Sequence, residues 1–419
     1  MRITPRLIDL TAAAAERVFD LQQPADSALS LFFREHRALG HRDRGFVAET
    51  VYALLRRRRT LEHVMPEKPT PRQLVLTALV RLYGIGVRQL APALAMGEAQ
   101  WLTLLKTKSD TPMTPAEQAD LPDWLYERLR EHAPDEAVQE LARGLNQAAP
   151  LDLRANPLKA ARDDVIGQLA AEDIAARAGR YSPLAIRLEG KPALQRHPLY
   201  LSGAIEVQDE GSQLLGYLVQ PKRGEMVVDF CAGAGGKTLM LGALMRSTGR
   251  LYAFDVSEKR LGRLRARVAR AGLSNVHPVC IAGENDVRVK RLAGKIDRVL
   301  VDAPCTGLGT LRRNPDLKWR QTPDSSAELA RKQADILAGA ARLVKSGGRL
   351  VYATCSVLPE ENERVVDAFL VAHPEFQRVS AARILARQHI DLDTGEELRL
   401  LPHVHDTDGF YAAVLERTG

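Results

Sequence analysis

The sequence predicts an α/β protein whose largest part is a doubly wound parallel sheet, preceded by an all-helical region and a small α+β subdomain. Three observations support this prediction. From about residue 206 onward, compact apolar runs alternate with helical patterns, as in buried parallel strands joined by crossover helices. Residues 1 to about 145 place apolar residues at helical spacing throughout. Between these regions, short strand-like pieces flank a single helical pattern, which is typical of a small mixed subdomain.

The first region, residues 1–145, is predicted to be helical from four segments that Pro and Gly interrupt. They read "SALSLFFREHRALG", "RGFVAETVYALLRRRRTLEHV", "PRQLVLTALVRLYGIGV" and "PDEAVQELARGLNQ". The start of the chain, "MRITPRLIDLTAAAAERVFD", mixes charges with its apolar residues and therefore predicts an amphipathic helix rather than a signal peptide. No apolar run approaches the length of a membrane span, so we expect no contact with a membrane.

Residues 146–205 are predicted to form the small subdomain, with strands at "LDLRAN" and "LAIRLEG" and a helix at "KAARDDVIGQLAAEDI". Residues 206–419 are predicted to form the doubly wound domain. Its strands are expected at "EMVVDF", "RLYAFDV", "DRVLVDAP", "GRLVYATC" and, close to the end, "DGFYAAVLER". The short apolar runs bounded by turn residues favour strands over helices.

Charge and cysteine content narrow the class of protein. The net charge is +7 and the pI about 9.3. Most of the excess lies beyond residue 150, in clusters at 259–270, 288–295 and 312–320, which permits a nucleic-acid partner without requiring one. For cluster 259–270 we favour an interpretation without a nucleic-acid contact, in which the charges lie on a solvent-exposed face of a helix. The four cysteines are far apart without C-x-x-C spacing, so we expect no zinc site, no disulfide framework and a reducing cytoplasm.

Chemically active side chains follow the predicted parallel strands at the points where the strands end. Asp229, Asp255 and Asp302 each close an apolar run, and Cys305 and Cys355 follow two of these runs. A single Asp at such a place is an ordinary strand end or helix cap. In an open parallel sheet, however, ligands bind beyond the carboxyl ends of the strands. The whole set therefore predicts a binding and catalytic edge.

The loop "VVDFCAGAGGKT", residues 227–238, imitates two phosphate-binding motifs and matches neither. A P-loop would need Gly where Cys231 stands, and a dinucleotide turn would need Gly where Thr238 stands. A Gly-x-Gly turn into a helix N-terminus still lets a ligand approach the backbone closely and favours a carboxylate. The acid Asp255, 26 residues after Asp229, suits a ribose diol. Together they predict a nucleoside with an amino-acid tail, S-adenosylmethionine; a P-loop NTPase is the alternative from another class.

Two cysteines beside this donor point to one kind of reaction. Carbon 5 of a pyrimidine is a weak nucleophile, and a thiolate that adds to carbon 6 activates it for methylation. A carboxyl group must hold the base, and the base must leave its stack for a thiol to reach its face. Cys305 and Cys355 follow their strands into this region, whereas Cys280, within "VHPVCIA", is expected to be a small buried hydrophobe.

At these motifs the sequence resembles the RsmB/Nop/Sun-type RNA (cytosine-5) methyltransferases. The resemblance is carried by "DFCAGAGGKT", "DVSEKRL", "VDAPCTGLGTLRRNPDLKW" and "YATCSVLPEENERVV", with "VQDEGSQLL" and "DGFYAAVL" at either side. It covers residues from about 150 to 419. The helical region resembles more loosely the NusB-like domain of RsmB-type bacterial enzymes, which implies an RNA-binding role.

The resemblance implies a Rossmann-like S-adenosylmethionine-dependent methyltransferase domain and a role for each matching residue. Cys355 would be the nucleophile toward carbon 6, Cys305 would assist release of the methylated RNA, and Asp302 would lie between cofactor and cytosine. The presence of both thiols favours RNA, since DNA cytosine methyltransferases use the Pro-Cys cysteine as nucleophile. Cofactor contacts are expected from Cys231, Ala232, Gly233, Ala234, Gly235, Gly236 and Lys237, together with Asp255, Arg260 and Asp302.

The chain departs from the family pattern at two places. Ala234 stands where the family commonly has proline, a change that the backbone should tolerate. After the third strand the family usually has an Asp for the adenine. This chain reads "CIAGEND" there, so Glu284, Asn285 and Asp286 remain alternatives for the contact.

By analogy with RsmB-type enzymes, the expected substrate is bacterial small-subunit ribosomal RNA; tRNA or another RNA is an alternative. A non-catalytic ribosome-assembly factor is a further alternative, which the presence of both thiols disfavours. No feature demands more than a monomer.

Overall fold

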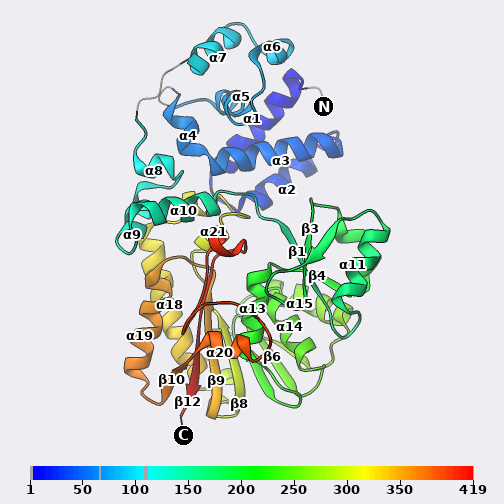
Figure 1. Ribbon diagram of the computed structural model, residues 1–419, viewed down its shortest axis with the longest axis vertical. Helices are drawn as coiled ribbons and strands as arrows, with labels where there is room; N and C mark the ends of the chain where they lie inside the picture. Colours follow the sequence, from blue (N-terminus) through cyan, green and yellow to red (C-terminus); the bar gives the residue numbers. More distant parts are fainter. Residues whose placement is uncertain (1–2, 66–67, 108–111, 419) are drawn as a thin grey trace. The chain divides into compact units, whose positions relative to one another are not determined.

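The computed structural model describes residues 3–65, 68–107 and 112–418, and the chain divides into two compact units (Figure 1). One unit comprises Met1–Gln147 with Thr310–Pro323, and the other comprises Ala148–Gly309 with Asp324–Gly419. The chain therefore passes from one unit to the other three times. The domain limits at residues 145 and 205 stay predictions.

The first unit is helical, as the periodicity predicts. Thr4 caps the first helix by accepting a hydrogen bond from the Leu7 N–H, and Thr70 and Gln73 form a capping box at the fifth. One core is built mainly from the buried faces of α1, α2, α3 and α5. The helices are α1 Pro5–Phe19, α2 Ala25–Glu35, α3 His41–Arg56, α4 Arg58–His63, α5 Pro71–Arg81, α6 Val87–Leu90, α7 Glu98–Thr107, α8 Pro115–Gln118, α9 Asp123–Arg130 and α10 Asp135–Leu145.

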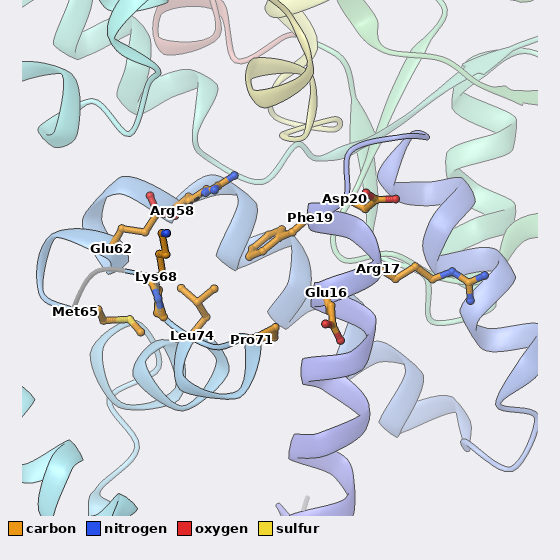
Figure 2. Close-up of a pocket in the computed structure, with 11 residues that line it drawn as sticks. Glu16, Arg17, Phe19, Asp20, Arg58, Glu62, Met65, Lys68, Pro71 and Leu74 are labelled. Carbon is orange, nitrogen blue, oxygen red and sulfur yellow. Dashed lines mark hydrogen bonds and ion pairs between the residues drawn. The ribbon is translucent and has the colours of Figure 1, made fainter.

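A groove of about 870 Å³ opens between α1, α4 and α5 of this unit (Figure 2). Acidic and basic side chains both line it. Two of its cations are already paired, Arg58 with Glu62 at 2.7 Å and Arg17 with Glu35 at 2.6 Å. Because the charges of the lining largely balance, the groove offers no strong preference for an anion or a cation.

The stretch Thr310–Pro323 belongs to the helical unit although in sequence it lies between two strands of the large sheet. Lys318, on the short helix α17 Leu317–Arg320, is fully buried there, and the Trp319 indole N–H donates to the Leu55 carbonyl at 2.8 Å. Two cations of cluster 312–320, Lys318 and Arg312, are 0% and 2% exposed, so they are not available to a nucleic-acid partner. The Lys318 Nζ donates to Arg56 O at 2.9 Å, Asp120 O at 2.7 Å and Asn146 Oδ1 at 2.8 Å.

Replacing Lys318 with methionine is expected to destabilise the helical unit by about 2 kcal/mol, because three buried acceptor oxygens lose their donor. Burial lowers the pKa of Lys318 to about 7, so part of this loss is offset by removal of a charge that is costly to bury. Thermal unfolding of the variant, compared with the exposed-lysine control Lys332→Met, measures the effect. A midpoint equal to that of the control would show that the three hydrogen bonds contribute no net stability.

The second unit begins with a small antiparallel sheet of order β2-β3-β1-β4. The helix α11 Arg162–Ala171 packs on it through Val165 and Leu169, and their core is separate from the core of the large sheet. The strands are β1 Leu151–Ala155, β2 Ala176–Ala178, β3 Ala185–Leu188 and β4 Ile205–Val207. The predicted strands and helix of the small subdomain are confirmed.

The large sheet has the order β10-β12-β9-β8-β5-β6-β7, with β11 paired to β12. Strands β5 to β9 run parallel, and β12 is antiparallel to β9. The strands are β5 Met226–Asp229, β6 Arg250–Asp255, β7 Val276–Cys280, β8 Ile296–Asp302, β9 Val344–Thr354, β10 Phe376–Val379, β11 Leu398–Leu400 and β12 Phe410–Arg417. The main helices are α13 Glu210–Val219, α14 Gly236–Leu244, α15 Glu258–Ala271, α18 Pro323–Ala341, α19 Glu363–Ala372 and α20 Ala381–Ala386.

Both faces of this sheet are covered by helices, which is why the central parts of its strands, such as Leu350–Ala353 of β9, are apolar on both sides (Figure 1). Along β9, Val351 and Ala353 face one core, while Leu350 and Tyr352 face the other. Helices α13, α14, α15 and α20 line the first core, and α18 and α19 line the second. The doubly wound α/β prediction is confirmed. Among the described residues, no helix has both the length and the apolar character that crossing a membrane requires.

Candidate active site

The carboxyl ends of β5, β6, β8 and β9 meet at one edge of the large sheet. Asp229, Asp255 and Asp302 are the last residues of β5, β6 and β8. Cys305 follows β8, and Cys355 directly follows β9. The parallel pairing thus brings together residues that lie more than a hundred positions apart in the sequence.

The loop from β5 to α14 is a tight glycine turn. Gly235 adopts φ +92°, and a Cβ on it would lie 2.1 Å from Leu264, so no larger residue fits there. Gly233, at φ +56°, faces open space instead. The loop therefore leaves space beside the Cα of Gly233 and packs against the protein at Gly235.

Asp255 is tied to this loop. Its carboxylate accepts hydrogen bonds from the backbone N–H of Gly233 at 2.8 Å and of Ser257 at 2.7 Å, and it forms an ion pair with Arg260 at 3.1 Å. Arg260 is largely exposed, while Asp255 is buried. Arg260 therefore holds the carboxylate from the solvent side.

Two arginines that sequence reasoning missed support the loop through its carbonyl groups. Arg154, from the small sheet, donates to Gly236 O at 2.8 Å, and Arg267 of α15 donates to Ala234 O at 2.7 Å. Arg267 also pairs with the buried Glu206 at 2.9 Å. With carbonyl groups engaged in this way, the loop is held in a fixed conformation. The sequence contains the arginines, but nothing in a single sequence indicates which carbonyl they meet.

Lys237, the lysine of the glycine motif, points to a carboxylate. Its Nζ lies 2.7 Å from Asp302 Oδ2 and 5.7 Å from the centre of the Phe410 ring. Burial works against the charge on Lys237, but Asp302 raises its pKa overall. The lysine therefore stays charged and orients Asp302.

Asp229 is fully buried, and its Oδ2 accepts a hydrogen bond of 2.6 Å from the Thr238 hydroxyl. Burial, with a smaller contribution from Asp302, raises the pKa of Asp229 to about 7. Its Oδ1 has no hydrogen-bond partner among the described residues. This orphaned oxygen leaves one polar position open beside the glycine turn.

Asp229→Asn is expected to change how stability depends on pH. Because the pKa of Asp229 is raised on folding, its protonation stabilises the fold at low pH, and this stability is lost as pH rises from about 4 to about 7. The shift corresponds to about 4 kcal/mol. Asparagine does not titrate, so the free energy of unfolding of the variant should increase relative to that of the wild type as pH rises from about 4 to about 7. Denaturant unfolding at pH 4.5 and 7.5 tests this; an equal stability difference at both values would contradict it.

Cys305 and Cys355 lie side by side, with their sulfur atoms 3.4 Å apart. The hydrogen bond to Cys355 and burial raise the pKa of Cys305 well above its usual value. The approach of the two loops depends on glycine: Gly309 N–H donates to Cys355 O at 2.8 Å, and Gly409 N–H donates to Gly309 O at 2.8 Å. A Cβ on Gly309 would lie 2.3 Å from Gly409 O, so the contact requires glycine.

The other predicted residues, two cysteines and the three candidates for the adenine contact, make contacts that do not assign them a role. Cys231 follows β5, and burial raises its pKa. Cys280 is half-buried and packs against one core of the large sheet, so the expectation of a small buried hydrophobe is confirmed in part; its Sγ lies 3.7 Å from Val256 O near the end of β7. Asp286 accepts hydrogen bonds from Arg288, which lowers its pKa, while Glu284 accepts one from Asn285. These contacts do not single out one of the three residues for an adenine.

The site combines a glycine turn at a helix N-terminus, a buried acid after the next strand and two thiols beside a carboxylate. On this sheet, that arrangement defines a Rossmann-like methyltransferase.

Comparisons with known proteins give the family. A family model described as 16S rRNA methyltransferase RsmB/F matches residues 216–416, and one described as Methyltr_RsmF/B-like, ferredoxin-like domain matches residues 121–195. The probable ribosomal RNA small subunit methyltransferase B of Synechocystis is 32% identical and covers 94% of this chain and 95% of its own. The chain belongs to the RsmB/F family of methyltransferases.

Two further similarities extend over the whole chain. The ribosomal RNA small subunit methyltransferase B of Sodalis glossinidius is 31% identical, with 98% of each chain covered. The crystal structure of PH0851 aligns with a TM-score of 0.81 at 28% identity and covers 100% of both chains. The resemblance seen in the sequence motifs is thus confirmed, and membership of a methyltransferase family replaces the P-loop alternative.

Proposed function

We propose that this protein transfers a methyl group from S-adenosylmethionine to carbon 5 of a cytosine in small-subunit ribosomal RNA. The observation that carries the proposal is the pair of thiols, 3.4 Å apart, at the ends of β8 and β9 beside Asp302. Binding of the methyl donor does not by itself require a cysteine thiol. Two thiols suit a reaction in which one adds to the ring and the other takes part in its release.

The glycine turn and its surroundings suit S-adenosylmethionine, which when bound supplies an activated methyl group. Residues 231–237 would surround its methionine part, with open space beside the Cα of Gly233 that permits a close approach. Asp255 would hold the ribose and Arg260 would orient that carboxylate. The orphaned Oδ1 of Asp229 offers a further polar contact. The adenine contact falls to Glu284, Asn285 or Asp286.

The chain's own residues account for activation of the cytosine. The Cys355 thiolate adds to carbon 6, which raises the electron density at carbon 5, the atom that is methylated. Asp302, held by Lys237 at 2.7 Å, is the fixed carboxyl group that hydrogen-bonds the base. Cys305 then assists the departure of Cys355 once the carbon 5 proton has been removed.

The proposed RNA substrate is supported by the presence of both thiols and by the relatives, whose names specify the RNA of the small ribosomal subunit. The excess of positive charge, +7 overall, favours binding to a polyanion. The helical residues 1–145 are proposed to contribute to RNA binding. The reaction is proposed to take place in the cytoplasm, where ribosomes are assembled, with the protein acting as a monomer.

The proposal is tested with the purified protein, tritiated S-adenosylmethionine and small-subunit RNA from cells that lack this chain. Digestion of the RNA to nucleosides should place the label in 5-methylcytidine. Label in another nucleoside would contradict the cytosine-5 chemistry. Label only in tRNA offered in parallel would contradict the ribosomal substrate while leaving the chemistry intact.

A further inference from the structure

A buried carboxylate outside the predicted site joins the two thiol-bearing loops. Glu361, in the short 3-10 helix Pro359–Glu361, is 0% exposed. It lies in neither the cofactor loop nor the thiol pair, and its side chain is shielded from solvent. Burying a carboxylate is costly unless hydrogen-bond donors surround it. The groups that donate to Glu361 therefore indicate which parts of the structure it holds in place.

Four donors converge on Glu361, and they come from both thiol loops and from α18. Thr306, which follows Cys305, donates its backbone N–H at 2.9 Å and its hydroxyl at 2.5 Å. Ser356, which follows Cys355, donates its hydroxyl to the same carboxylate. Gln333 of α18 donates to Glu361 at 2.9 Å and to the Pro304 carbonyl at 2.9 Å. The loop of Cys305 is therefore held on both sides of the cysteine.

Glu361 is itself held in place by a residue of the large sheet. The Tyr352 hydroxyl, on β9, donates to the Glu361 carbonyl at 2.6 Å, and Ser356 Oγ accepts from the Leu358 N–H at 3.1 Å. All of these partners lie within the second unit. A carboxylate, which only accepts hydrogen bonds, suits this position because the groups that Thr306, Ser356 and Gln333 direct at it are donors.

We propose that Glu361 is a positioning residue that sets the distance between the two thiols, acting on Cys305 through Thr306 and on Cys355 through Ser356. Its catalytic consequence rests on the proposed function, because the separation matters only if one thiol adds and the other assists release. A misplacement of about 1 Å in such a site can reduce a rate by about 100-fold.

The first experiment measures geometry without using the methylation reaction. Diamide, a mild thiol oxidant, should link Cys305 and Cys355 in the wild type, because their sulfur atoms are already in contact. Peptide mapping by mass spectrometry identifies the linked pair. In Glu361→Gln the side-chain NH2 group would face the hydrogen-bond donors of Thr306, Ser356 and Gln333. Formation of the Cys305–Cys355 disulfide should therefore slow by about tenfold or more. The matched control Glu363→Gln, two residues away on α19, should keep the wild-type rate. Equal rates in all three proteins would overturn the proposal.

The second experiment separates the two loops by changes small enough to preserve the fold, with S-adenosylmethionine binding as the check. Thr306→Val removes the hydroxyl contact between the Cys305 loop and Glu361 but keeps the backbone N–H contact, and it should accumulate part of the covalent RNA adduct that Cys305→Ala is expected to give. Ser356→Ala removes the hydroxyl contact between the Cys355 loop and Glu361, and it should slow both adduct formation and methyl transfer. The same adduct pattern in both variants would overturn the assignment. If Cys305→Ala itself gave no adduct, the proposed function would fail, while the diamide experiment would still decide the role of Glu361.

Discussion

Replacement of Cys355 by alanine is expected to abolish methyl transfer, with a loss of at least about 10⁴-fold. Without a thiolate at carbon 6 the cytosine ring stays unactivated. The Cys305 sulfur is close, but it sits on the other loop, and its pKa is raised by the contact with Cys355 and by burial. Incorporation of tritium from S-adenosylmethionine into RNA measures the loss.

Cys280→Ala is the matched control for this experiment. Cys280 is half-buried at the end of β7, where its Sγ lies 3.7 Å from the Val256 carbonyl oxygen. At saturating S-adenosylmethionine it should retain activity within about twofold, since a half-buried thiol replaced by a methyl group causes little change in packing. Substantial activity in Cys355→Ala would exclude Cys355 as the nucleophile. Unchanged donor binding in that variant excludes misfolding as the cause of the loss.

Replacement of Cys305 by alanine is expected to trap the protein on its RNA. Addition by Cys355 proceeds, but release stalls because the second thiol, 3.4 Å away, is absent. On a denaturing gel the variant should show a slow-migrating band that RNase removes, and turnover should stop after the first event.

The double replacement Cys305→Ala/Cys355→Ala distinguishes a covalent adduct from tight binding. It should lose the band completely, since neither thiol remains to form the bond. A Cys305→Ala variant that turns over normally, or a band that persists in the double variant, would contradict the assigned roles.

The sequence predicts the sheet and its active edge well because both depend on local signals. The parallel strands β5, β6, β8 and β9 each carry a compact apolar run that ends in Asp or in a cysteine motif, and parallel strands bring such ends together wherever the chain runs between them. Thus the sequence alone is sufficient to place Asp229, Asp255, Asp302, Cys305 and Cys355 on one edge. The glycine turn could be separated from phosphate-binding motifs by counting residues.

The missed features depend on contacts between distant segments. Lys318 belongs to a basic cluster that has the composition of an RNA contact, yet it is buried against oxygens that segments more than 170 positions earlier supply. Arg154 meets Gly236 O, and Glu361 meets Thr306, in the same way. A charged residue is ordinarily expected to be exposed, and only the fold shows which buried acceptors or donors satisfy it.

The most direct measurement of the central claim uses small-subunit RNA in which cytosine is replaced by 5-fluorocytosine. Fluorine at carbon 5 cannot leave as a proton, so the intermediate should remain attached to the enzyme. Mass spectrometry of the digested complex is predicted to find a methylated 5-fluorocytidine nucleotide on the peptide that contains Cys355. Attachment at Cys305, or no attachment despite binding of donor and RNA, would contradict the proposed role of Cys355.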